Sequence, residues 1–90
     1  MPVEVHFPSM LRHHIGNNTF IESEGRTVGE CLAELAKRFP GLKDQLYEKD
    51  GKLKRVIEIY VNGVSAYPKE LEKEVKDGDK VFITLMLAGG

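Results

Sequence analysis

The last strand of the chain has nothing after it to close the fold. Residues 80–86 form an apolar strand pattern, and the sequence then ends through Leu87, Ala88, Gly89 and Gly90 with no charged tail and no further helix. A strand this apolar is typical of the interior of a sheet, covered on at least one face. We therefore expect the final strand to lie centrally and the last four residues to lie outside the sheet.

Two glycines make the end of the chain accessible. Gly89 and Gly90 have no Cβ atom, so they can enter a narrow channel in another protein. An extended chain gains at most ~3.5 Å per residue, which lets Leu87 to Gly90 project roughly 14 Å from the fold. The pattern favours a tail that carries its terminal carboxylate into a partner's active site. A frayed end or an expression scar is the alternative that the terminus alone leaves open.

Length and charge limit the class of protein. Ninety residues suffice for one domain, predicted to span residues 1–86, with 87–90 as a flexible tail. Lys and Arg number 13 against 14 Asp and Glu, so a net charge of −1 gives no broad basic field for nucleic acid. No apolar run approaches the ~18 residues of a membrane span, and residues 1–4 do not open a signal peptide. The single cysteine, Cys31, favours a reducing compartment, and we expect a cytoplasmic protein without membrane or nucleic-acid partners.

Alternating apolar and polar residues predict two strand pairs before the final strand. The first pair joins strands at 3–7 and 19–22 through a long connection. The second joins strands at 55–61 and 64–67 through Asn62-Gly63, a dipeptide typical of tight hairpins. The expected inward-facing residues of the first, third and final strands are Val3, Val5, Phe7, Ile57, Ile59, Val61, Val81, Ile83 and Leu85.

The stretch from 28 to 39 has the spacing of one amphipathic helix. Thr27, followed three residues later by Glu30, is a capping-box signal at its start. The apolar stripe that should face the sheet consists of Val28, Leu32, Leu35, Ala36 and Phe39. Cys31 lies about 60° from the centre of that stripe, so we expect it to be half-buried. Residues 42–47 add one further helical turn.

This order of elements predicts an α+β fold of the β-grasp (ubiquitin-like) type. We expect a mixed sheet of four to five strands, with the last strand parallel to the first. One main helix should pack across one face of this sheet and leave the other face open.

Few side chains have the pattern of a catalytic or metal site. His13 and His14 are adjacent, and since neighbouring side chains point apart in regular structure, we expect solvated loop histidines rather than metal ligands. His6 falls on the outward side of the first strand. Cys31 has no base near it in sequence and is expected to fill space between helix and sheet. With no phosphate-binding loop or nucleophile elbow, the sequence predicts a protein that is not itself an enzyme and binds neither metal nor cofactor.

The outward positions of the late strands predict a partner-docking patch. If Val61 and Val81 face inward, Tyr60, Phe82 and Met86 face outward and form an apolar patch that leads to the tail. Exposed apolar patches of this kind often mark interfaces. Cover by a long loop or by a second copy of the chain is the alternative.

Five short segments, in their order along the chain, resemble the ubiquitin-like sulfur carriers. They are Pro8 with Leu11-Arg12, Thr27-Val28-Gly29-Glu30, Val61-Asn62-Gly63, Lys76-Asp77-Gly78-Asp79 and Leu87-Ala88-Gly89-Gly90. The family contains the small subunit of molybdopterin synthase and the thiamine-thiazole carrier, and the resemblance covers nearly the whole chain. Segments 7–14 and 52–55 are most similar to the carrier of thiocarboxylate-dependent cysteine biosynthesis.

The resemblance implies a mechanism and partners. An ATP-dependent activating enzyme would adenylate the carboxylate of Gly90, and sulfur would displace AMP to leave a thiocarboxylate. Leu87, Ala88 and Gly89 would thread into the partner. The sulfur acceptor would be a pyridoxal-phosphate cysteine synthase, the large subunit of molybdopterin synthase or a thiazole synthase. ATP would be used by the activating enzyme, and the carrier itself would bind no cofactor.

Two other functions stay open on the sequence. A ubiquitin-like protein modifier would use the same activated Gly90 to join a lysine of a target. A plain β-grasp interaction module would make no use of the terminal glycines.

Overall fold

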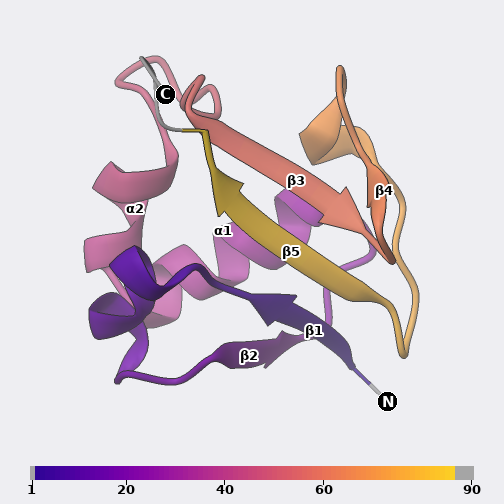
Figure 1. The fold of residues 1–90 in the computed structure, drawn as a ribbon, viewed down its shortest axis with the longest axis horizontal. Helices are drawn as coiled ribbons and strands as arrows, with labels where there is room; N and C mark the ends of the chain where they lie inside the picture. The colour runs from indigo at the N-terminus through magenta and orange to yellow at the C-terminus, as the bar shows by residue number, and fades with distance from the viewer. Residues whose placement is uncertain (1, 87–90) are drawn as a thin grey trace.

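A five-stranded mixed sheet forms the centre of the molecule (Figure 1). The computed structural model describes residues 2–86. The strand order is β2-β1-β5-β3-β4, in which β1 and β5 are parallel and the other neighbours are antiparallel. The strands are β1 (Val3–His6), β2 (Phe20–Ser23), β3 (Ile57–Val61), β4 (Val64–Ser65) and β5 (Lys80–Leu85). The central final strand, its parallel pairing with the first strand and the β-grasp class are all confirmed.

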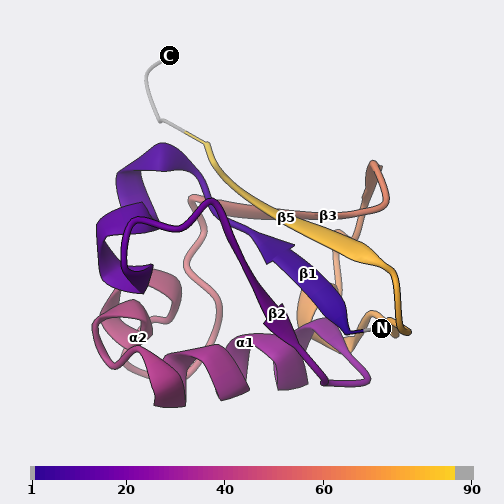
Figure 2. The ribbon, with the colours of Figure 1, turned by 90° about the horizontal axis from the view of Figure 1, so that it is seen from below.

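Two α-helices cover one face of this sheet and leave the other open. Helix α1 (Val28–Arg38) and helix α2 (Gly41–Leu46) lie on the same side, as Figure 2 shows. Two 3-10 helices, η1 (Ser9–Ile15) and η2 (Glu70–Glu72), occupy the connections after β1 and after β4.

The core lies between the sheet and α1. Alternate strand residues point toward the helix, and the helix returns an apolar stripe at i, i+4 and i+7 spacing. The predicted inward residues Val3, Val5, Phe7, Ile57, Ile59, Val61, Val81, Ile83, Val28, Leu32 and Leu35 are all buried. Leu85, Ala36 and Phe39 are only half-buried because they lie toward the ends of their elements.

The start of α1 is capped on both sides. Thr27 Oγ1 accepts a hydrogen bond from the Glu30 amide at 3.1 Å, as predicted. The Glu30 carboxylate accepts from the Arg26 amide at 2.9 Å, one residue earlier than an ideal capping box would place it. Gly29 lets η2 approach the helix closely, since a Cβ atom there would lie 2.8 Å from the Leu71 carbonyl oxygen.

Cys31 corrects one expectation, because it is fully buried rather than half-buried. The chain between β2 and α1 folds over this side of the helix. A Cβ atom on Gly25 would come within 2.6 Å of the Cys31 amide nitrogen, so this segment packs directly on the helix backbone, and the Gly25 backbone also hydrogen-bonds to the thiol. Helical spacing locates the stripe that faces the sheet but does not show that a loop will close over its edge.

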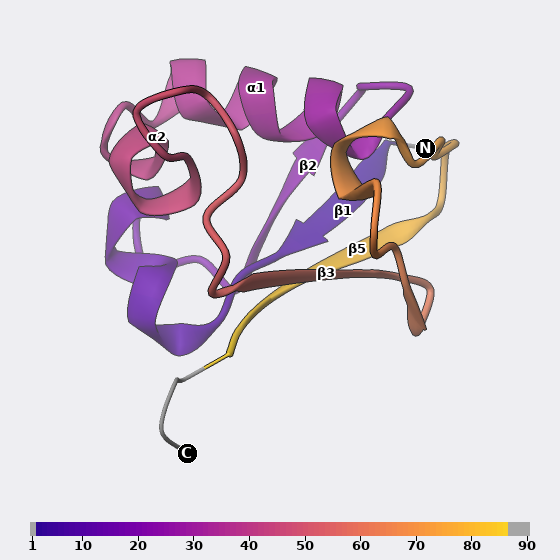
Figure 3. The same cartoon turned by 90° about the horizontal axis from the view of Figure 1, so that it is seen from above.

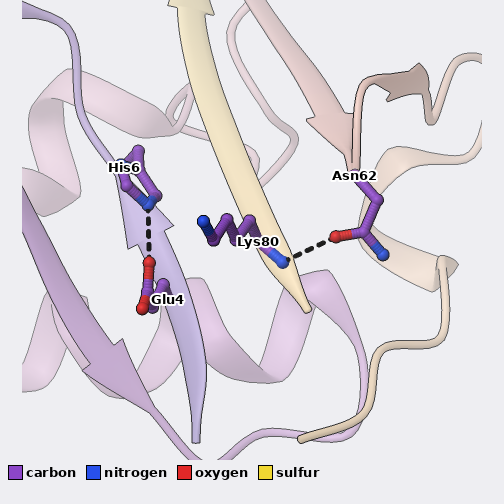
Figure 4. A network of polar contacts seen from close by, with 4 residues as sticks. All are labelled: Glu4, His6, Asn62 and Lys80. Atoms are coloured by element: carbon purple, nitrogen blue, oxygen red, sulfur yellow. Dashed lines mark hydrogen bonds and ion pairs between the residues drawn. The ribbon is translucent and has the colours of Figure 1, made fainter. Parts of the chain in front are cut away.

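The turn after β3 is fixed by Asn62. Asn62 and Gly63 have φ values of 52° and 85°, as the predicted tight hairpin requires. The Asn62 side-chain amide nitrogen donates to Asp79 Oδ1 at 3.0 Å. The Asn62 side-chain oxygen accepts from the Lys80 amide at 2.9 Å, as Figure 4 shows. These bonds tie the turn to the first residue of β5 and help to set the register of the two central antiparallel strands.

The remaining segments differ from the predictions mainly at their limits. Four strands begin later or end earlier than predicted by one or two residues, and β2 is shifted by one residue, from 19–22 to 20–23. The segment after Pro8 is a 3-10 helix rather than a loop, with Leu11 buried as expected. The last residue that the structure describes is Met86, so the domain boundary after residue 86 stays a prediction. Within residues 2–86, no helix is long and apolar enough to cross a membrane.

Candidate functional site

Two of the three residues of the predicted patch lie side by side on the open face. Tyr60 and Phe82 are direct cross-strand partners of β3 and β5. Phe82 is 37% exposed and Tyr60 is half-buried. Residues directly opposite each other on antiparallel strands have side chains close enough to present one surface.

A row of four aromatic side chains crosses the sheet at this level. Phe20 of β2 pairs with His6 of β1, His6 pairs with Phe82 of β5, and Phe82 pairs with Tyr60 of β3. The His6 ring stacks on Phe20 with centroids 4.9 Å apart and on Phe82 with centroids 4.4 Å apart. We call Phe20, His6, Phe82 and Tyr60 the aromatic row. It extends the predicted patch by two residues.

Sequence reasoning missed His6 and Phe20 because it treated each strand separately. Both residues stand at outward positions of their strands, which the alternation already indicated. The register between β1 and its two neighbours brings them next to Phe82, and a single sequence does not contain that register. The sequence nevertheless contained one indication of this surface. An outward-facing aromatic residue in each of several strands is typical of a surface that binds another molecule.

A row of charged residues borders the aromatic row on the side away from Met86. Glu4 pairs with Glu22 on one side and with Lys80 on the other. One Glu4 oxygen lies 2.9 Å from His6 Nε2, as Figure 4 shows, and this contact fixes the plane of the ring. The stacked row therefore presents its rings in a set orientation.

Met86 is the residue after β5, and a polar pair separates it from the aromatic row. Thr84 pairs with Glu58, and its hydroxyl donates to the Glu58 carbonyl oxygen at 3.4 Å. The Met86 amide donates to the Val56 carbonyl oxygen at 2.6 Å, and the Met86 residue is 50% exposed. The predicted patch thus has two parts, the aromatic row and a second apolar surface where β5 ends.

The predicted sulfur-attachment and threading residues lie outside the described residues. These are Gly90, and Leu87, Ala88 and Gly89. Their roles stay predictions.

The two adjacent histidines correct an expectation but do not make a metal site. The rings of His13 and His14 lie 4.0 Å apart rather than pointing away from each other. They belong to η1, and successive side chains of a 3-10 helix diverge by about 120° rather than the 180° of a strand. Within the described part of the chain, no group of three or more His, Cys, Asp or Glu side chains could hold a metal ion.

The environment of Cys31 does not activate its thiol. Burial raises the pKa of Cys31 above its ordinary value of 9.0, while hydrogen bonds to Ser23 and the Gly25 backbone act against this to a smaller extent. Glu34 and Glu30 raise the pKa further. A nucleophilic cysteine needs the opposite shift, so the geometry supports the expected filling role.

Together, these features define the class of protein. The parallel pairing of first and last strands, with a helix across one face of a mixed five-stranded sheet, is that of a ubiquitin-like β-grasp protein. The chain belongs to the ThiS family, whose model matches residues 5–90.

Known relatives match over the full length. The sulfur carrier protein CysO of Mycobacterium tuberculosis is 33% identical over 93 residues, which covers 100% of both chains. Among solved structures, a chain of the BexX/CysO complex of Amycolatopsis orientalis is 39% identical with a TM-score of 0.86, covering 98% of this chain and 99% of that one. The small archaeal modifier protein 1 of Methanosarcina acetivorans is 28% identical with a TM-score of 0.85, covering 98% and 95%.

Proposed function

We propose that this chain is a sulfur carrier protein whose working group is the C-terminal carboxylate of Gly90. The observation that carries the proposal is the full-length match to the CysO sulfur carriers within the ThiS family. The terminal Gly-Gly supports it, because glycine leaves the carboxylate unhindered at the end of a narrow approach.

The proposed chemistry has two steps, each carried out by a partner enzyme. A carboxylate oxygen of Gly90 attacks the α-phosphorus of ATP, pyrophosphate leaves, and an acyl-adenylate forms. A sulfur nucleophile equivalent to hydrosulfide then attacks the carbonyl carbon, and AMP leaves with the bonding electrons. The product is a thiocarboxylate, whose anionic sulfur is a much better nucleophile than a carboxylate oxygen.

In this proposal the folded domain is the surface that partner enzymes bind, and it does not catalyse the reaction. The aromatic row provides an ordered apolar surface for an activating enzyme, with Phe82 and Phe20 as its exposed rings. Aromatic side chains at the centre of a patch are typical anchors of interfaces. The fully buried Cys31 stays a thiol and takes no part in the transfer.

The acceptor that we propose is a cysteine-forming enzyme that uses pyridoxal phosphate. The sequence resemblance of segments 7–14 and 52–55 and the matches to CysO both favour it. A molybdopterin synthase large subunit and a thiazole synthase use related carriers and are the other acceptors to test.

Removal of Gly90 tests the carrier role. The full-length protein and a variant that lacks Gly90 are each incubated with the adenylating enzyme of the same organism, ATP and labelled pyrophosphate. We expect full-length protein to support exchange of label into ATP, and the shortened protein, with an unchanged melting temperature, to support none. Equal exchange with both proteins would refute the role of Gly90.

A second candidate function is that of a protein modifier. The structural match to the small archaeal modifier protein 1 favours it, and it needs the same activated Gly90. It predicts an isopeptide bond to a lysine of another protein, so denaturing gels would show a ladder of larger species that contain this chain.

A further inference from the structure

An apolar collar surrounds the point where β5 ends. Met10, Val56 and Met86 are 61%, 41% and 50% exposed, and they come from η1, the segment before β3 and the residue after β5. The three side chains line one hollow of about 250 Å3, together with Leu85. Figure 3 shows the end of β5 beside the start of β3, in agreement with the pairing of those strands. We call Met10, Val56 and Met86 the collar.

Two cations stand next to the collar. Lys54 lines the same hollow, and both Lys54 and Arg55 line a groove of about 520 Å3 on the other side of Met86. The backbone holds the segment in place, since the Lys54 amide donates to the Leu46 carbonyl at 2.9 Å and its carbonyl accepts from the Ile57 amide at 3.0 Å. The fold therefore fixes the backbone from which the Lys54 side chain extends, next to the hollow that Met86 also lines.

Neither cation has a partner within the described part of the molecule. Among residues 2–86, no side-chain hydrogen bond or ion pair involves the Lys54 ammonium or the Arg55 guanidinium. Glu58 and Glu70 line the same groove, but Glu58 is in contact with the Thr84 hydroxyl and pairs with neither cation. The two charges are available to a partner protein.

The length of the tail brings that partner against the collar. Four residues follow Met86, so Gly90 lies at most roughly 14 Å from it along an extended chain. An active site that holds the carboxylate of Gly90 at such a short distance must place its outer wall on Met86 and its neighbours. This step depends on the proposed role of Gly90.

We propose that the collar and its two cations dock on the mouth of the tail channel of the activating enzyme, and that this mouth carries carboxylates opposite Lys54 and Arg55. An unpaired cation is costly to remove from water, so a mouth that covers both side chains must supply counter-charges. Charges at the edge of an interface also steer the approach of a partner and set its orientation. The aromatic row provides apolar contact, and the cations align the tail with the channel.

A double charge reversal with a matched control tests this proposal. The variant Lys54→Glu/Arg55→Glu is compared with Lys43→Glu/Lys49→Glu, which changes two exposed lysines of α2 and the following turn away from the collar. The probe is the adenylating enzyme of the same organism, and kcat/KM for the carrier is measured by pyrophosphate exchange at low and high salt. We expect a loss of about tenfold or more for the collar variant at low salt, no loss for the control, and a smaller difference at high salt.

Each other outcome contradicts the proposal in a distinct way. Unchanged kcat/KM for a folded collar variant, with wild-type protein adenylated normally, overturns the acidic mouth and leaves the carrier function intact. If wild-type protein supports no pyrophosphate exchange, both the acidic mouth and the proposed carrier function are overturned. A carrier dimer that Lys54→Glu/Arg55→Glu dissociates would assign the collar to a second copy of the chain. Arg55→Glu alone, at an exposed position, replaces the double variant if that variant does not fold.

Discussion

His6 lies directly opposite Phe82 in the parallel pair of β1 and β5, and the two rings stack with centroids 4.4 Å apart at an angle of 21°. Phe20, on the neighbouring strand β2, stacks on His6 from the other side. The His6 ring therefore lies between two phenyl rings, and its contact with Glu4 fixes the plane of the ring. An interface whose side chains are already ordered loses less conformational entropy on binding. The open face is therefore a preformed docking surface rather than a set of isolated exposed residues.

Replacement of Phe82 by aspartate should weaken binding to the activating enzyme by about 1–3 kcal/mol. The ring is the best placed anchor of the aromatic row, and a carboxylate there would be desolvated in the complex. Isothermal titration with the purified enzyme measures the change. Val64→Asp, at an exposed apolar position on the edge strand β4, is the control and should bind like wild type. A normal isotherm for a folded Phe82→Asp protein would remove the aromatic row from the interface.

Replacement of His6 by alanine should lower both stability and affinity. The change removes two stacked contacts, each worth about 0.5–1.5 kcal/mol beyond simple burial. Urea unfolding should show a loss of about 1–2 kcal/mol, and the affinity for the activating enzyme should fall because Phe20 and Phe82 lose their support. His13→Ala, at an exposed position of η1, should change neither quantity. Equal stability of His6→Ala and wild type would show that the stacking contributes nothing.

Replacement of Asn62 separates two contributions to stability in the turn after β3, the side-chain hydrogen bonds and the backbone strain. Asn62→Ala loses the hydrogen bonds to Asp79 and Lys80 and must place an alanine at a φ of 52°. Asn62→Gly loses the same bonds without that backbone strain, so it should be about 1 kcal/mol more stable than Asn62→Ala. Chemical unfolding of the three proteins measures the difference, and identical stability of the two variants would refute the strain term.

The same turn predicts a dependence on acid pH. The Asn62 amide and the Lys76 backbone amide lower the pKa of Asp79 below its ordinary value of 3.8. A carboxyl whose pKa is lower in the folded protein than in the unfolded chain stabilises the fold at any pH above its unfolded-chain pKa. This stabilisation is lost as the pH falls through the pKa of the folded protein. The stability advantage of wild type over Asn62→Ala should therefore narrow below pH 3.8. An advantage that is constant from neutral to acid pH would contradict the role of the carboxylate.

Cys31 predicts the opposite dependence at alkaline pH. Burial raises the pKa of this thiol above 9.0, so the folded protein keeps its proton while the unfolded chain releases it. The stabilisation that the protonated thiol gives is complete below the pKa of the thiol in the unfolded chain. It is lost as the pH rises through the pKa of the thiol in the folded protein. The free energy of unfolding of wild type, compared with Cys31→Ala, should therefore fall above pH 9.0.

Cys31→Ser should still transfer sulfur, and loss of transfer by a folded variant would implicate the thiol in the chemistry.

The sequence predicted the fold well because its local signals agree with one another. Asn62-Gly63, the Thr27 cap and the alternation in the first and last strands each specify an element that the structure contains. The first and last strands are both apolar enough to be central, and together with one amphipathic helix this pattern led to the β-grasp arrangement and its parallel pair. Residues 9–15 were missed as a helix because a short 3-10 segment has no apolar period to detect.

The candidate site was only partly accessible to sequence reasoning. Tyr60 and Phe82 follow from alternation along their own strands, but His6 and Phe20 join them only through the register between strands. Cys31 was placed on the correct element with too much exposure, because the loop that covers it makes contacts distant in sequence from the helix stripe.

The most direct test of the proposed function is the intact mass of the carrier. Purified protein is incubated with its adenylating enzyme, ATP and a sulfur donor, and the C-terminal fragment is then examined by mass spectrometry. Exchange of one carboxylate oxygen for sulfur at Gly90 should raise the mass by ~16 Da. An unchanged terminal mass while the enzyme consumes ATP in the presence of the carrier would contradict the thiocarboxylate, and a ladder of conjugates would instead support a protein modifier.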